Sequence, residues 1–163
     1  MKWRAYSPAT ARIAELVGAQ PVTVQAAELQ QAMATGVVES YMSSGATGFD
    51  TKTYEHIKYF YDTQAWLPKN AVIVNKAAFD ALDAPSKQAV LKAGADAEAR
   101  GFAVSKAKND EYKELLKKNG MNIVAPSAAL TSDMKKVGDT MLKEWLEKAG
   151  PEGQAMIDAY KKL

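Results

Sequence analysis

Residues 2–24, KWRAYSPATARIAELVGAQPVTV, contain the pattern that decides the fold. The first five of them predict a short β-strand. Ser7 and Pro8 then predict the start of a helix, because serine is a favoured N-cap and proline fits the first helical position. Gly18 suits the end of that helix, and residues 22–24 predict a second strand. The stretch is therefore expected to form a strand–helix–strand unit.

The same alternation continues further along the chain. A second helix is expected over residues 26–35, ended by Gly36, and a third strand over residues 37–43. The sequence SSGATG at residues 43–48 is expected to form a loop, and residues 51–58 a short helix. Strands that alternate with helices through short connections predict a largely parallel α/β sheet.

The second half of the chain predicts longer elements. Residues 71–75 (AVIVN) are expected to form an apolar strand and residues 76–82 a short helix. A long helix is expected from the capping sequence Asp83-Ala-Pro85 to about Lys118. Roughly 34 residues at 1.5 Å each would extend about 50 Å, beyond the width of a compact domain of this size, so the helix is expected to contact something larger than the chain. The remaining expected elements are a strand at residues 121–124 and helices at residues 131–148 and 151–163.

Composition excludes several classes of function. The 163 residues include 21 Lys and Arg and 19 Asp and Glu, which gives a formal charge of +2. Such a balance produces no field that suits nucleic acid or an anionic membrane, so no nucleic-acid partner is expected. The chain has no cysteine, which excludes disulfides, thiolate nucleophiles and cysteine-based zinc sites.

The sequence contains no catalytic constellation. Its single histidine, His56, has no second histidine nearby and is expected to be structural. Two Ser-x-x-Lys matches, Ser105 with Lys108 and Ser132 with Lys135, lie on polar helices without the other elements of a serine hydrolase. No enzymatic activity, cofactor or histidine-based metal site is therefore expected, and whether a metal ion assists ligand binding stays open.

Polar and aromatic residues at strand ends are the remaining candidates, because parallel sheets bind ligands at the carboxyl ends of their strands. Arg4 is either an edge residue or a bidentate partner of a carboxylate. Ser43 and Ser44 are either turn residues or donors that face an anion. Trp66 either packs in the interior or forms the wall of a cleft.

Three stretches carry the pattern of a known family. They are KWRAYSPATARIAELVGAQPVTV (residues 2–24), AAELQQAMATGVVESYMSSGATG (residues 26–48) and YEHIKYFYDTQAWLPKNAVIVNKAAFDAL (residues 54–82). They contain a K-x-R strand, a GA-P turn, an A-x-E-x-x-x-A-(L/M)-x-x-G-V-V-(D/E) unit and a Y-E-x-x-K-Y segment. In this order they resemble the solute-binding subunits of tripartite ATP-independent periplasmic (TRAP) transporters of the DctP type.

The resemblance implies a periplasmic-binding-protein-like architecture. Members of the family have two α/β lobes around a cleft, which close on a small organic acid and deliver it to a sodium-driven membrane permease in the periplasm. They are about twice as long, so an N-terminal lobe is expected to be missing here. Residues 1–69 would form the ligand-binding second lobe, residues 70–107 would return to the missing first lobe, and residues 108–163 would complete the second lobe.

The resemblance also assigns site residues. The arginine that forms the salt bridge to the substrate carboxylate corresponds to Arg4. Ser43 stands where the sialic-acid branch often has asparagine, so this chain departs from that branch. Trp66 corresponds to a ligand-side position at the entry of the crossover between lobes, and Ser7 is a further cleft-facing candidate. Ser44 stays a candidate from its place at the strand end.

Two other functions remain open from the residues alone. One is an enzyme or sensor domain on a similar lobe, which the missing catalytic constellation disfavours. The other is a fragment that self-associates as a homodimer through residues 71–75 and the first turns of the long helix, because these would expose apolar surface. The chain alone is expected to bind ligand weakly or not at all.

Overall fold

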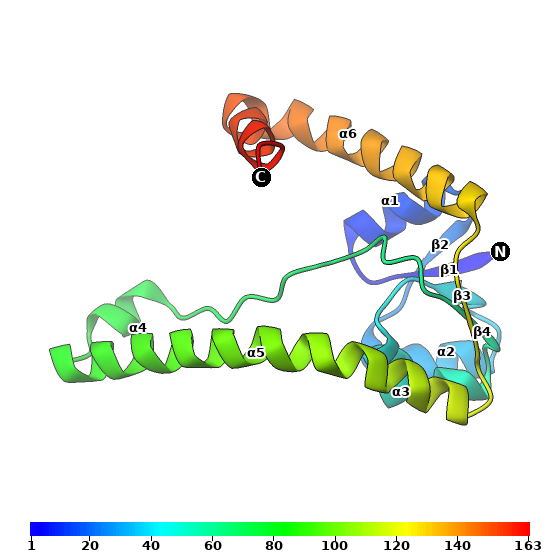
Figure 1. Ribbon diagram of the computed structural model, residues 1–163, viewed down its shortest axis with the longest axis horizontal. Coiled ribbons are helices and arrows are strands. Elements are labelled where there is room, and N and C mark those ends of the chain that lie inside the picture. The colour runs from blue at the N-terminus through cyan, green and yellow to red at the C-terminus, as the bar shows by residue number, and fades with distance from the viewer.

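A parallel β-sheet begins the structure, a computed structural model that describes residues 1–163. Three strands form it in the order β2-β1-β3, so β1 lies in the centre (Figure 1). In the register, Trp3 of β1 lies opposite Pro21 of β2 and Ser40 of β3. The parallel α/β prediction is confirmed. The elements in this part are β1 (Lys2–Ala5), α1 (Pro8–Leu16), β2 (Gln20–Thr23), a 3₁₀ turn (Ala26–Glu28), α2 (Leu29–Ala34) and β3 (Ser40–Tyr41).

The first helix forms where local signals predict it. The Ser7 hydroxyl accepts a hydrogen bond from the backbone N–H of Thr10 at 3.2 Å, and Thr10 Oγ1 accepts one from the N–H of Ser7 at 3.0 Å. This reciprocal capping satisfies two donors at the start of α1. Gly18 then turns the chain toward β2 with a φ of 73°, a left-handed conformation that favours glycine.

The residues predicted to form a loop after β3 instead form α3 (Gly45–Asp50). Ser44 caps this helix, because its hydroxyl accepts a hydrogen bond from the N–H of Thr47 at 3.1 Å. A Cβ added at Gly48 would lie 3.6 Å from Leu116 Cδ2. Because Gly48 has no side chain, α3 can pack closely against α5 (Ala84–Lys118). The third strand is also shorter than predicted, at two residues.

A second, two-stranded sheet joins distant parts of the chain. It pairs β4 (Tyr59–Tyr61) with β5 (Asn122–Val124) in parallel. The strand β5 was predicted, whereas β4 was not. The helix predicted over residues 51–58 is reduced to a 3₁₀ turn at Thr53–Glu55.

The long helix α5 spans 35 residues and begins as predicted. Asp83 caps it by accepting a hydrogen bond from the N–H of Ser86 at 2.7 Å, and α4 (Lys76–Asp80) precedes it. The strand predicted at residues 71–75 does not form, because no other strand lies beside it to pair with its backbone. Ile73 in this segment is 88% exposed.

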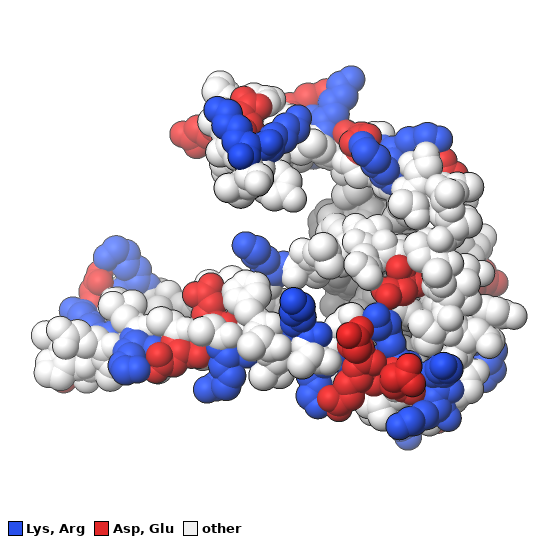
Figure 2. All heavy atoms as spheres, in the orientation of Figure 1, with Lys and Arg blue, Asp and Glu red and all other residues white.

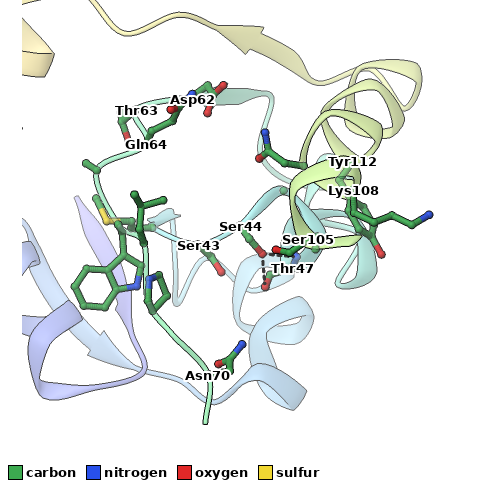
Figure 3. Close-up of a pocket in the computed structure, with 18 of the residues that line it drawn as sticks. Ser43, Ser44, Thr47, Asp62, Thr63, Gln64, Asn70, Ser105, Lys108 and Tyr112 are labelled. Carbon is green, nitrogen blue, oxygen red and sulfur yellow. Dashed lines mark hydrogen bonds between the residues drawn. The ribbon is translucent and has the colours of Figure 1, made fainter. Parts of the chain in front are cut away.

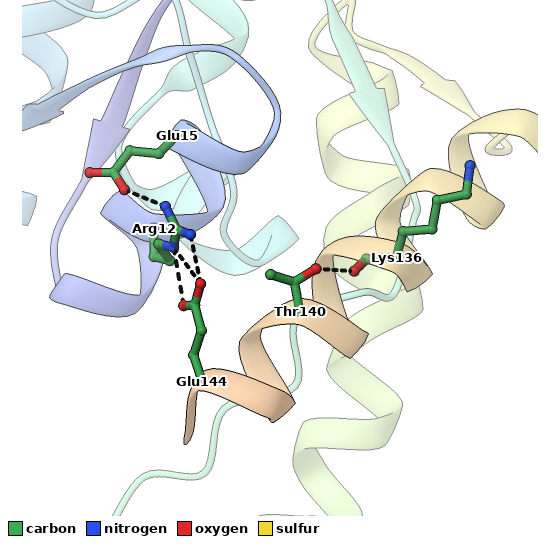
Figure 4. A network of polar contacts seen from close by, with 5 residues as sticks. All are labelled: Arg12, Glu15, Lys136, Thr140 and Glu144. Atoms are coloured by element: carbon green, nitrogen blue, oxygen red, sulfur yellow. Dashed lines mark hydrogen bonds and ion pairs between the residues drawn. The ribbon is translucent and has the colours of Figure 1, made fainter. Parts of the chain in front are cut away.

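The last helix, α6 (Ala128–Tyr160), is kinked at Gly150, which has a φ of 63° and precedes Pro151. The prediction of two successive helices, at residues 131–148 and 151–163, is confirmed, because the kink at Gly150 divides α6 into two helical parts. Arg12 of α1 holds α6 through Glu144, with Nη2 of the arginine 2.6 Å from the carboxylate (Figure 4).

The helices α5 and α6 extend as two arms from the sheets (Figure 1). Charges of both signs are spread along the arms, and the hollow between them is lined mostly by uncharged residues (Figure 2). The core beneath the sheet is a cluster of Val24, Leu29, Ala32, Met33 and Val38. Only 15 of the 163 residues are buried, so the arms leave apolar side chains without partners. No helix combines the length and the hydropathy that crossing a membrane requires.

Candidate ligand-binding site

A cavity of about 800 Å³ lies at the carboxyl ends of β1, β3 and β4 (Figure 3). Its other walls are the crossover segment after β4 and the middle of α5. The volume is within the range of small-molecule sites. Parallel sheets place ligand sites at this end of their strands, so the topology and the cavity agree.

Arg4 is the buried charged residue of this cavity. Its side chain is buried, with 4% of the residue exposed, and its Nε donates a hydrogen bond to the carbonyl oxygen of Val24 at 2.9 Å. Its Cζ lies 4.9 Å from the ring centroid of Tyr6 and 5.8 Å from that of Tyr41. Burial lowers the pKa of the guanidinium, and the two tyrosines partly offset this.

The terminal nitrogens of Arg4 have no partner in the chain. The arginine forms no ion pair, and Nε is its single hydrogen-bonding atom. Unlike the indole nitrogen of Trp3, these nitrogens are not sealed from solvent. A buried cation of this kind requires a compensating charge or acceptor. The free edge of Arg4 therefore suits a bidentate carboxylate.

Three further sequence candidates line the same cavity as Arg4, namely Ser43, Ser44 and Trp66. The Ser43 hydroxyl makes no hydrogen bond to the protein, whereas that of Ser44 caps α3. Figure 3 shows both serines at the start of α3. Ser7 does not line the cavity. Its hydroxyl instead caps α1, two residues after the end of β1.

Trp66 connects the crossover segment to the first strand. Its indole N–H donates a hydrogen bond to the hydroxyl of Tyr6 at 2.9 Å, across sixty positions of sequence. Gln64, two residues earlier, has a φ of 50°, which is unfavourable for a residue other than glycine. The crossover is thus fixed at a wall of the cavity.

Helix α5 contributes cavity side chains that were not among the predicted site residues. Ser105, Lys108 and Tyr112 all line the cavity, although the first two were noted only as part of a chance hydrolase pattern. Spacings of three and four residues place such side chains on one helical face. This spacing in the sequence predicts that the three side chains share one face of the helix. It does not predict which strands that face packs against.

The other charges near the cavity are paired or exposed. Lys108 lies 2.6 Å from Glu111, and Lys113 contacts both Asp62 at 3.1 Å and Asp110 at 2.9 Å. Lys69 forms no ion pair and is exposed. Arg4 is therefore the one buried cation that a ligand can neutralise. The chain has no group of three or more acidic, histidine or cysteine side chains placed to hold a metal ion.

A ligand-sized cavity with one unpaired buried cation suits the binding of a small anion. Residues 1–149 match the family described as bacterial extracellular solute-binding protein, family 7 (DctP). The chain belongs to this family. Comparison with curated proteins found no match.

Solved structures give the more particular relationship. The chain is similar to DctP6 of Bordetella pertussis, an extracytoplasmic solute receptor binding pyroglutamic acid, with 71% identity over 99% of the chain and a TM-score of 0.97. It is similar to DctP7 of the same organism, which also binds pyroglutamic acid, with 44% identity over 98% of the chain and a TM-score of 0.95.

A third similar structure is a TRAP solute-binding protein from a marine metagenome, specific for pyroglutamate. It shares 42% identity over 100% of the chain, with a TM-score of 0.96. The chain spans about half the length of all three, covering 54%, 53% and 54% of them.

Proposed function

We propose that this chain acts as the second lobe of a two-lobed receptor that captures a small organic acid through Arg4. The observation that supports this most directly is a buried arginine with free terminal nitrogens in a ligand-sized cavity. Closure of a second lobe over the cavity would exclude water. Exclusion of water strengthens an arginine–carboxylate pair, because the effective dielectric falls.

The proposed ligand is pyroglutamate or a similar small cyclic carboxylate. Three similar receptors bind pyroglutamate or pyroglutamic acid. Such a molecule has one carboxylate, which would pair with Arg4, and one neutral lactam group. The hydroxyls of Ser43, Thr63 and Ser105 line the cavity and are suited to the lactam. Trp66 and Ser44 would form the remaining wall, and Ser7 would act only indirectly through the end of β1.

The first lobe of the receptor would cover the segment 70–107. Support comes from its exposure, because every residue of α5 from Ala84 to Val104 except Ser86 and Lys87 is exposed. Two large apolar side chains of the segment 70–107 are also exposed, Val72 before α4 at 105% and Phe102 in α5 at 63%. Residues 1–69 and 108–163 would together form the second lobe. The receptor would work in the periplasm and deliver its ligand to the sodium-driven permease subunits of a TRAP transporter.

Calorimetric titration of the two-lobed receptor with pyroglutamate tests the proposal. Arg4→Ala should weaken binding by about 100-fold, because it removes a buried charged partner of the ligand. Arg12→Ala is the matched control, since this arginine pairs with Glu144 outside the cavity, and it should leave the affinity unchanged. Affinity that survives Arg4→Ala would refute the proposed anchor. The 163-residue chain alone should bind weakly or not at all.

Self-association is a second candidate, favoured by the exposed apolar segment Val72 to Val74. Light scattering of the 163-residue chain at increasing concentration should then show a dimer. A monomer at every concentration would contradict this second candidate and leave the receptor proposal unaffected.

A further inference from the structure

The surroundings of Arg4 contain two aromatic ring faces and no carboxylate. A buried arginine in a protein usually has an acidic partner. Here the guanidinium has the rings of Tyr6 and Tyr41, with centroids 4.9 and 5.8 Å from Cζ, and one carbonyl oxygen at Nε.

We propose that Tyr6 and Tyr41 are positioning residues that hold the Arg4 guanidinium in place of an acidic counter-ion. The ligand carboxylate is then the first full negative charge that Arg4 meets. This inference rests on the proposed function, because it explains how the receptor keeps its anchor free for the ligand. It assigns a specific task to two residues that do not themselves need to contact the ligand.

The chemistry of a ring face suits this task. A tyrosine face attracts a cation through its quadrupole but accepts no N–H hydrogen bond in the plane of the guanidinium. An acidic side chain would occupy the terminal N–H groups and compete with the ligand. Aromatic faces therefore stabilise the charge while its donors stay available.

Both rings are fixed at their hydroxyl ends. The Tyr41 hydroxyl lies 2.5 Å from Oγ1 of Thr53, which is 3% exposed, and Thr53 is 3.1 Å from Oγ1 of Thr51. The Tyr6 hydroxyl accepts a hydrogen bond from the indole N–H of Trp66. Burial raises the pKa of Tyr41, and the hydrogen bonds from Thr53 and Thr51 partly offset this, so the phenol stays neutral at physiological pH. The rings are thus anchored from two different segments.

Three substitutions of Tyr41 in the two-lobed receptor test the inference, with pyroglutamate and its neutral carboxamide as probes. Tyr41→Phe keeps the ring and should bind pyroglutamate within about threefold of the wild type. Tyr41→Leu removes the ring and should weaken pyroglutamate binding about tenfold. Tyr41→Glu supplies a counter-ion and should weaken it further. Tyr54→Leu is the control, because Tyr54 packs on Phe49 and lies outside the cavity.

The ratio of acid to amide affinity distinguishes positioning of Arg4 from general support of the fold. Tyr41→Leu should lower this ratio, whereas a purely structural role would weaken both probes equally and would overturn the inference. Pyroglutamate affinity within twofold of the wild type in a folded Tyr41→Leu protein would overturn it too. Failure of the proposed function has a separate signature, since the wild type would then not bind pyroglutamate or would be insensitive to Arg4→Ala.

Discussion

The ammonium group of Lys113 in α5 lies 3.1 Å from the carboxylate of Asp62, fifty-one residues earlier at the end of β4. Both side chains are largely shielded, with 21% and 23% exposed. The same ammonium lies 2.9 Å from Asp110, whose side chain is 81% exposed. One lysine therefore has an internal and an external partner, and the internal one joins the second sheet to the long helix.

Asp62→Asn should lower the free energy of unfolding by about 1 kcal/mol, because it removes the shielded partner of Lys113. Asp110→Asn is the matched control and should have no measurable effect, since exposed pairs contribute little. Urea denaturation followed by circular dichroism measures both. Equal losses for the two variants would show that the position of the pair is unimportant.

The contact between α1 and α6 should weaken in acid. Hydrogen bonds from Arg12 lower the pKa of Glu144 below its ordinary value of 4.5. Because the folded pKa is the lower one, the pair stabilises the contact above pH 4.5 and loses this effect as the pH falls through the lowered pKa. The stabilisation from this ion pair is modest, since both side chains are more than a third exposed to solvent. The fluorescence of Trp145 and of the other tryptophans, recorded against pH, should report the change.

Glu144→Gln should remove that acid transition, and Glu147→Gln should leave it in place, because Glu147 forms no ion pair with Arg12. An unchanged transition in Glu144→Gln would mean that another group controls the contact.

The kinked end of α6 should not tolerate alanine at Gly153. An added Cβ would lie 2.5 Å from Ala149 Cβ and 3.1 Å from the ring of Trp145, so Gly153→Ala should cost about 1–3 kcal/mol by overpacking. Gly138→Ala meets no atom within 4 Å and should gain about 0.5–1 kcal/mol from helix propensity. Thermal unfolding compares the two, and a stabilised Gly153→Ala protein would contradict the packing.

The strained residue of the crossover segment offers another test. Gln64 has a φ of 50°, so Gln64→Gly should be neutral or stabilising by about 1 kcal/mol, and Gln64→Val should be destabilising. Thr63→Val at the neighbouring position, where φ is not positive, is the control. If both valine variants unfold alike, the left-handed conformation carries no cost.

Local signals explain which elements the sequence could predict. Ser7, Asp83 and the glycines at 18 and 120 determine helix ends through their own hydrogen bonds or φ angles, so α1 and α5 were predictable. The strand predicted at residues 71–75 was wrong, because a strand needs a pairing partner, which a sequence pattern does not supply.

The missed elements depend on contacts between distant residues. The strand β4 forms because Asn122 and its neighbours lie beside it, and α3 forms where Ser44 caps a glycine-rich stretch that packs on Leu116. The cavity wall from α5 follows from the same packing. Arg4 was predicted as the anchor only through the family resemblance, because its isolation from carboxylates exists only in three dimensions.

The close contact between α3 and α5 has a mechanical consequence. Helix α5 is held near Tyr112 and Leu116, and its other end lies far beyond that contact. An unbroken helix of 35 residues acts as a stiff rod of about 50 Å. A tilt of about 5° at its contact with α3 therefore moves the N-terminal end of α5 by roughly 4 Å. Small rearrangements next to the cavity are thereby magnified at α4.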